Sequence, residues 1–104
     1  MGNGLERLEK LPRAILAHTP TPIEHLPNLS VKIGGAVLYV KRDDCTGLAL
    51  GGNKARQLEY YVGDALSQDA DTILITGAVQ SNFVRAAAAA AARYGLTCQI
   101  QLEE

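Results

Sequence analysis

Lys54 holds the position in this sequence that is best suited to covalent chemistry. It follows Gly51, Gly52 and Asn53 and stands where we expect a helix to begin. The positive end of a helix dipole disfavours an ammonium group and therefore favours the neutral amine. A neutral amine acts as a nucleophile or condenses with an aldehyde to form a Schiff base. The alternative is a solvated lysine on a helix that merely starts after a glycine-rich turn, because short motifs often match by chance.

A second candidate is the segment of residues 77–82, which ends in Ser81 and Asn82 just before a predicted helix. A serine there caps the helix by accepting a hydrogen bond from an amide of the first turn, and this role alone explains it. The functional alternative uses the same geometry, because free N–H groups at a helix start bind anions. A substrate carboxylate would then dock on the amides of residues 81–83, and Asn82 would donate to a ring oxygen.

The other polar side chains give no metal site in the sequence. His18 and His25 lack the spacing of metal ligands and have no acidic companion pattern. Asp43 and Asp44 are adjacent in a glycine-containing loop, where carboxylates serve turns and caps more often than metals or acid–base pairs. We therefore predict no bound metal.

Length and charge exclude several classes of function. The 104 residues suffice for one globular domain, and a formal charge of −1 argues against binding to nucleic acid or an anionic membrane. No apolar run is long enough to cross a bilayer, and the N-terminus has no apolar signal core, so we predict a cytoplasmic protein. Cys45 and Cys98 fit neither a disulfide framework nor a zinc site, and we expect two buried or half-buried thiols.

The elements that must position these candidates alternate along the chain. We predict strands at residues 36–40, 72–76 and 97–102 and helices at residues 26–33, 53–68 and 82–94. Short connections between them indicate an α/β fold, a right-handed βαβαβ unit with a parallel sheet. Loops at the carboxyl ends of such strands hold ligands, which places both candidates at one edge. Residues 1–35 carry all four prolines and form an N-terminal arm, whereas residues 36–104 form a partial α/β domain.

Patterns within these elements predict how they are covered. Residues 72–76 are apolar without alternation, as in a strand covered on both faces, whereas residues 97–102 alternate and predict a half-exposed strand. The alanine run at residues 86–92 predicts a helix that lies close to the sheet. The helix at residues 53–68 presents an apolar stripe made of Leu58, Tyr61, Val62, Ala65 and Leu66.

Four motifs, in matching order and spacing, together resemble a known enzyme family. They are Lys-Arg-Asp-Asp at residues 41–44, Thr-Gly-Leu at 46–48, Gly-Gly-Asn-Lys-x-Arg-x-Leu-Glu at 51–59 and Gly-Ala-Val-Gln-Ser-Asn-x-x-Arg at 77–85. The family is that of D-cysteine desulfhydrase and 1-aminocyclopropane-1-carboxylate (ACC) deaminase, whose members use pyridoxal phosphate and have the tryptophan-synthase-β-like fold, fold type II. The implied reaction is β-elimination of sulfide from D-cysteine to pyruvate and ammonia. ACC deaminase and L-cysteate sulfo-lyase are the alternatives.

The resemblance also implies a role for each candidate residue. Lys54 would bind the cofactor covalently and, once displaced by substrate, take the α-proton. Asn82 would hydrogen-bond the ring hydroxyl of the cofactor, and Asn53 would line the cofactor pocket. Ser81, a candidate catalytic residue, would hold the substrate carboxylate together with Asn82 and Phe83. Family members usually have histidine at the position of Phe83, which bears on substrate choice.

Other features of the family lie outside this sequence. The phosphate-binding loop and the partner of the pyridine nitrogen belong to later parts of family members, so we expect the chain to be the N-terminal portion of a larger, homodimeric enzyme. We expect the isolated chain to hold pyridoxal phosphate weakly and to be inactive. A non-catalytic α/β remnant that binds a small anion or a protein partner is the alternative from another class. A Rossmann-type nucleotide binder lacks support, because neither strand is followed by Gly-x-Gly-x-x-Gly.

Overall fold

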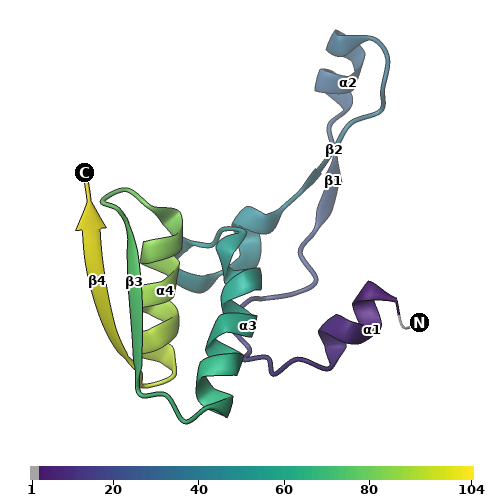
Figure 1. Cartoon of the computed structure of the whole chain (residues 1–104). Helices are drawn as coiled ribbons and strands as arrows, with labels where there is room; N and C mark the ends of the chain where they lie inside the picture. The colour runs from purple at the N-terminus through teal and green to yellow at the C-terminus, as the bar shows by residue number, and fades with distance from the viewer. Residues whose placement is uncertain (1–2) are drawn as a thin grey trace.

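The protein, described here by a computed structural model over residues 3–104, has a layered body and a projection that extends away from it (Figure 1). The body consists of helices α3 (Lys54–Ser67) and α4 (Asn82–Arg93) and strands β3 (Thr72–Ala78) and β4 (Thr97–Glu103). The projection consists of β1 (Ile23–His25), α2 (Pro27–Ile33) and β2 (Tyr39–Lys41), and α1 (Gly4–Glu9) lies at the N-terminal end. Two short 3-10 helices, η1 (Asp43–Thr46) and η2 (Leu48–Leu50), lead into α3. None of the helices within residues 3–104 is long and apolar enough to span a membrane.

Strands β3 and β4 form a parallel pair joined by α4, as the alternating pattern predicts. Their register runs from Thr72 opposite Thr97 to Ala78 opposite Glu103. Helix α4 ends where Gly95 adopts a φ of 70°, a left-handed conformation typical of the residue after a helix. The alanine run does bring α4 close to its neighbours, because four of its alanines are buried: Ala86, Ala87, Ala90 and Ala91.

The opposite face of the β3–β4 sheet is open, which differs from the prediction of a strand covered on both faces. Leu74 of β3 is 73% exposed, although it lies in the centre of the apolar run. An open groove of about 400 Å³ on the sheet is lined by Leu74, Ile75, Thr76, Gln99, Ile100 and Gln101. Strand β4 is exposed along most of its length and only Cys98 is half-buried, so the strand is more exposed than the half-exposed strand that its alternating sequence predicts.

The strand predicted at residues 36–40 exists, shifted to Tyr39–Lys41, but it does not join the parallel sheet. β2 pairs antiparallel with β1, with Ile23 opposite Lys41 and His25 opposite Tyr39, so the three-stranded βαβαβ sheet is wrong in its first strand. The rings of His25 and Tyr39 lie 5.1 Å apart across this pair. A close antiparallel partner is available through the short α2 connection, and it satisfies the backbone of β2 locally. The predicted helix at residues 26–33 is confirmed as α2.

The core lies between α3, α4 and an extended part of the N-terminal arm. Its buried members are Ala14, Leu16, Leu58, Val62, Ala86, Ala87 and Ala90. The predicted apolar stripe of α3 is only partly buried, because Tyr61 is 62% exposed whereas the neighbouring Glu59 is 1% exposed. The arm crosses α3 at Gly63, where a β carbon would lie 2.5 Å from the carbonyl oxygen of Pro12.

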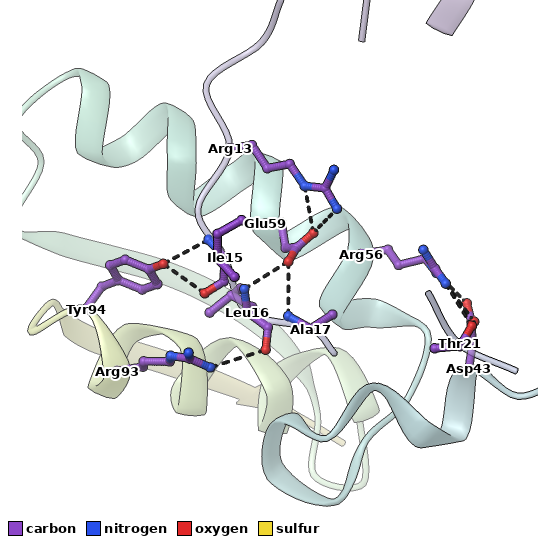
Figure 2. Close-up of polar contacts among 10 residues, drawn as sticks. All are labelled: Arg13, Ile15, Leu16, Ala17, Thr21, Asp43, Arg56, Glu59, Arg93 and Tyr94. Atoms are coloured by element: carbon purple, nitrogen blue, oxygen red, sulfur yellow. Dashed lines mark hydrogen bonds and ion pairs between the residues drawn. The ribbon is translucent and has the colours of Figure 1, made fainter. Parts of the chain in front are cut away.

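Both helices hold the arm through polar contacts with its backbone (Figure 2). The carboxylate of Glu59 accepts hydrogen bonds from the amides of Leu16 and Ala17, at 2.9 and 3.0 Å. The hydroxyl of Tyr94, just after α4, accepts from the amide of Ile15 and donates to its carbonyl oxygen, both at 2.8 Å. Residues 15–17 of the N-terminal arm are therefore hydrogen-bonded both to α3 and to the residue that follows α4.

Candidate functional site

The loop that leads into Lys54 is shaped by residues with positive φ. Gly51 has a φ of 83° and Gly52 a φ of 126°, conformations that residues with a β carbon rarely adopt. A β carbon on Gly51 would also overlap the carbonyl oxygen of Asp44. The loop is fixed from within, because the amide of Gly52 donates to Asp43 at 3.1 Å and the buried Thr46 hydroxyl donates to the Gly52 carbonyl at 2.7 Å. The two glycines are therefore required by the backbone path that delivers Lys54.

Lys54 is the first residue of α3, as predicted, and its side chain is half-buried. Among residues 3–104 the amine makes no ion pair and no hydrogen bond. Asn53 precedes it in a helical conformation, and its exposed side chain does not cap the helix. Both side chains are thus available to a ligand.

Ser81 caps α4, as its position before the predicted helix indicates. Its hydroxyl oxygen accepts a hydrogen bond from the amide of Val84 at 3.3 Å, so the hydroxyl proton is left to donate elsewhere. The amides of Asn82 and Phe83 in the first turn have no intrahelical acceptor. Asn82 is exposed. The structure confirms the cap, and the carboxylate site on these amides stays a prediction.

Gly77 allows the start of α4 to lie against the end of β3. A β carbon at this position would lie 2.6 Å from Cγ2 of Val84 and 3.4 Å from Oγ of Ser81. The segment of residues 77–82 thus contains the last two residues of β3, the connection at residues 79–81 and the first residue of α4, at the carboxyl end of a parallel strand where the sequence predicts a ligand loop.

The two candidate segments are joined by a contact that the sequence does not reveal. Nη2 of Arg85, in the first turn of α4, donates to the carbonyl oxygen of Gly51 at 3.0 Å. The loop before Lys54 does not follow a strand of the parallel sheet, because β2 lies in the other sheet. Contact with α4, rather than a shared sheet edge, brings the two segments together.

Phe83 lies on the apolar side of the α4 start. Its ring meets Tyr61 of α3 edge-on, with centroids 6.3 Å apart and an interplanar angle of 87°. An open groove of about 410 Å³ is lined by Leu58, Tyr61, Ala65, Thr72, Ile73, Leu74, Ile75 and Phe83. The ring of Phe83 therefore serves the packing of α4 against α3, and only its amide belongs with the predicted carboxylate site.

The remaining polar residues of the loop hold structure. Asp43 accepts from the Arg56 guanidinium at 2.7 Å and from the Thr21 hydroxyl at 2.6 Å. The hydrogen bonds from Arg56, then from Thr21, lower the pKa of Asp43 to about 2. Within residues 3–104 no group of three His, Cys, Asp or Glu side chains is arranged to hold a metal ion. Cys45 is exposed, contrary to expectation, and Cys98 is half-buried.

Arg56 and Glu59 are supporting residues that carry no role in the sequence interpretation. Both belong to the motif at residues 51–59, one turn and two turns after the glycines. Arg56 ties α3 to the preceding loop through Asp43, and Glu59 ties α3 to the arm. Charged residues on a helix ordinarily indicate a solvated face. The only sign of these contacts in the sequence is that Arg56 and Glu59 belong to the same motif as Lys54.

Residues 14–104 match the family described as pyridoxal-phosphate dependent enzyme. ACC deaminase of Rhizobium leguminosarum bv. viciae is 54% identical over 99 residues, which cover 93% of this chain and 29% of that protein. D-cysteine desulfhydrase of Salmonella newport is 52% identical over 99 residues, covering 95% of this chain and 30% of that protein. The crystal structure of an ACC deaminase homologue superposes with a TM-score of 0.88 at 49% identity, covering 94% of this chain and 30% of that one. The chain thus spans about 30% of the length of these relatives.

Proposed function

The chain belongs to the family of pyridoxal-phosphate dependent enzymes, and from this premise we propose that its site serves the β-elimination of sulfide from D-cysteine. The products would be pyruvate, ammonia and hydrogen sulfide. The fold is that of the fold type II members, which confirms the predicted α/β class. The proposal rests above all on one observation: Lys54, which has no ion-pair or hydrogen-bond partner among residues 3–104, begins α3 and is linked through Gly51 and Arg85 to the helix that Ser81 caps and Asn82 begins.

The side chains at the site fit pyridoxal phosphate, the cofactor of the family. Its aldehyde requires an amine, and the amine of Lys54 has no ion-pair partner within residues 3–104. Its ring hydroxyl requires a polar partner, and the amide groups of Asn53 and Asn82 are exposed. When bound, pyridoxal phosphate supplies an electron sink for the charge left at Cα after loss of its proton.

The chain's own residues supply attachment, orientation and proton transfer. Lys54 would attach the cofactor covalently, and its amine Nζ would take the α-proton of the substrate. Asn82 would donate a hydrogen bond to the ring hydroxyl, and Asn53 would line the cofactor pocket. The substrate carboxylate lies on the free amides of Asn82 and Phe83, where the helix dipole favours an anion. The Ser81 hydroxyl, whose oxygen already serves Val84, donates its proton to the same carboxylate.

The deamination of ACC is a second candidate. It is favoured by the 54% identity to an ACC deaminase, which is similar to the 52% identity to D-cysteine desulfhydrases. Both substrates carry the α-carboxylate that the α4 amides would bind, so this half of the site does not separate them.

We also propose, from the resemblance alone, that the enzyme acts in the cytoplasm as a homodimer. Sedimentation of the purified protein tests the dimer.

Reductive trapping tests the central residue without requiring turnover. The chain is incubated with pyridoxal phosphate, reduced with borohydride and mapped by mass spectrometry. The other lysines, Lys10, Lys32 and Lys41, serve as internal controls. We expect Lys54 to carry most of the label, Lys54→Ala to lose it, and Lys32→Ala, which removes an exposed lysine, to keep it. Label spread evenly over all four lysines would contradict the proposal.

The substrate can be identified by NMR, from the shifts of the backbone amide resonances of residues 81–83 when a candidate substrate is added. D-cysteine is expected to shift them at lower concentration than L-cysteine, and the comparison with ACC decides between the two candidates. Equal, weak shifts with all three compounds would count against a substrate site at these amides.

A further inference from the structure

We propose that Arg85 is a positioning residue that fixes the loop before Lys54 to the start of α4. It would thereby keep the Lys54 amine and the amides of Asn82 and Phe83 in one relative position. The roles of those groups rest on the proposed function, whereas the contact made by Arg85 does not depend on it.

The guanidinium of Arg85 lies against both glycines of the loop. Nη2 donates to the carbonyl oxygen of Gly51 at 3.0 Å, and the same nitrogen lies 3.6 Å from the place of a β carbon on Gly52. A hydrogen bond from a charged donor is stronger than one between neutral groups. Arg85 lies in the first turn of α4, three residues after Asn82. One side chain thus connects the two segments that carry the candidate site.

The loop transmits this contact to Lys54 because it is held on its other side as well. Gly52 is bound by Thr46 through its carbonyl and by Asp43 through its amide. Gly51 has no room for a β carbon beside Asp44. Lys54 follows Gly51 by three residues, so the position of the Gly51 carbonyl limits where α3 can begin.

The second terminal nitrogen of Arg85 indicates that this residue adds little to the stability of the fold. Nη1 is buried and has no hydrogen-bond partner within residues 3–104. A buried donor without an acceptor costs free energy, which an apolar side chain of similar length would avoid. Replacing Arg85 by methionine should therefore loosen the loop while leaving the stability of the fold nearly unchanged. If Arg85 served only packing, its replacement would loosen the loop and lower the stability of the fold together.

Amide hydrogen exchange of the full chain tests this separation. In Arg85→Met we expect the amides of Gly51 and Gly52 to exchange about tenfold faster, the factor that loss of a charge-assisted hydrogen bond of modest strength gives. Arg85→Lys should restore part of the protection because it keeps a charged donor. Arg93→Met is the matched control, since Arg93 also donates to a carbonyl, that of Leu16 at 3.3 Å, at the far end of α4. It should leave exchange at both glycines unchanged.

A second measurement links the loop to Lys54. The rate of borohydride trapping of pyridoxal phosphate at Lys54 should fall several-fold in Arg85→Met and stay unchanged in Arg93→Met. Unchanged exchange at Gly51 and Gly52 in Arg85→Met, an equal rise in Arg93→Met, or failure of Arg85→Met to fold would each overturn the proposal. Faster exchange at the glycines with unselective trapping in the unmodified chain would support the positioning role of Arg85 and reject the proposed function.

Discussion

Arg13 and Glu59, which are 46 residues apart in sequence, form a two-pronged contact in which Nε and Nη2 of the arginine donate to one carboxylate oxygen at 2.8 and 2.6 Å. The other oxygen accepts the amides of Leu16 and Ala17. Glu59 is 1% exposed, and a carboxylate so deeply buried is stable only when it is partnered in this way. The pair therefore attaches the N-terminal arm to α3, the helix that begins with Lys54.

Replacing Glu59 by glutamine should destabilise the fold. The substitution keeps the shape but removes the charge that four donors share, and we expect a loss of about 2 kcal/mol, the value of hydrogen bonds to a charged group. The shift of the urea midpoint measures it. Glu24→Gln is the matched control, because Glu24 pairs with Arg42 on an exposed surface, where ion pairs contribute little. Equal midpoints for the two variants would show that the buried contact is unimportant.

The stability of the chain should fall in acid in a window set by Glu59 and Asp43. Burial alone would raise the pKa of Glu59, but the amides of Ala17 and Leu16 and the Arg13 guanidinium lower it below its ordinary value of 4.5. Arg56 and Thr21 lower the pKa of Asp43 from 3.8 to about 2. A carboxylate with a lowered folded-state pKa stabilises the fold above its unfolded-state pKa and loses this contribution as the pH falls.

Urea titrations at a series of pH values measure this acid dependence. The free energy of unfolding should be flat above about pH 5 and decline toward pH 2. Glu59→Gln and Asp43→Asn should each make the decline shallower. A decline as steep in both variants as in the unmodified chain would assign the acid sensitivity to other groups.

Gly77→Ala should displace the start of α4. The new methyl group would lie 2.6 Å from Cγ2 of Val84, and overpacking of this kind costs about 1–3 kcal/mol. The double variant Gly77→Ala/Val84→Ala removes the clash and should recover part of that loss, as a double-mutant cycle in urea measures. Gly35→Ala is the control, since a β carbon there meets nothing within 4 Å. Additive losses in the double variant would disprove the contact.

Phe83→His should weaken the contact between α4 and α3. The edge-on pair with Tyr61 contributes about 1 kcal/mol beyond its buried area, and an imidazole only partly replaces it. The stability loss should shrink when Tyr61 is already alanine, which a cycle of four unfolding curves tests.

The local signals of the sequence predicted the elements of the body and the placement of the site residues. Ser81 and Gly95 mark the ends of α4 because caps are determined by neighbouring residues. Lys54 begins α3 directly after the glycine-containing loop, although no side chain caps this helix. These features need no knowledge of distant parts of the chain.

The contacts that the sequence did not predict depend on distant backbone groups. Glu59 reads as a solvated helix residue because its acceptor role depends on amides 42 and 43 residues away. Arg85 donates to a backbone carbonyl 34 residues away, which leaves no trace in residue types. β2 finds its partner in β1, a three-residue strand between two prolines that is too short to give a periodic signal.

The double hydrogen bond between Tyr94 and Ile15 has a consequence for how the protein is made. Its partners are 79 residues apart, and at about 5–20 residues per second a ribosome needs roughly 4–16 s to pass from one to the other. For an interval of that length after it leaves the ribosome, the segment around Ile15 lacks the hydroxyl of Tyr94. The segment around Ile15 therefore gains its contact with Tyr94 later than its contacts with Glu59, which lies only 43 and 42 residues from Leu16 and Ala17.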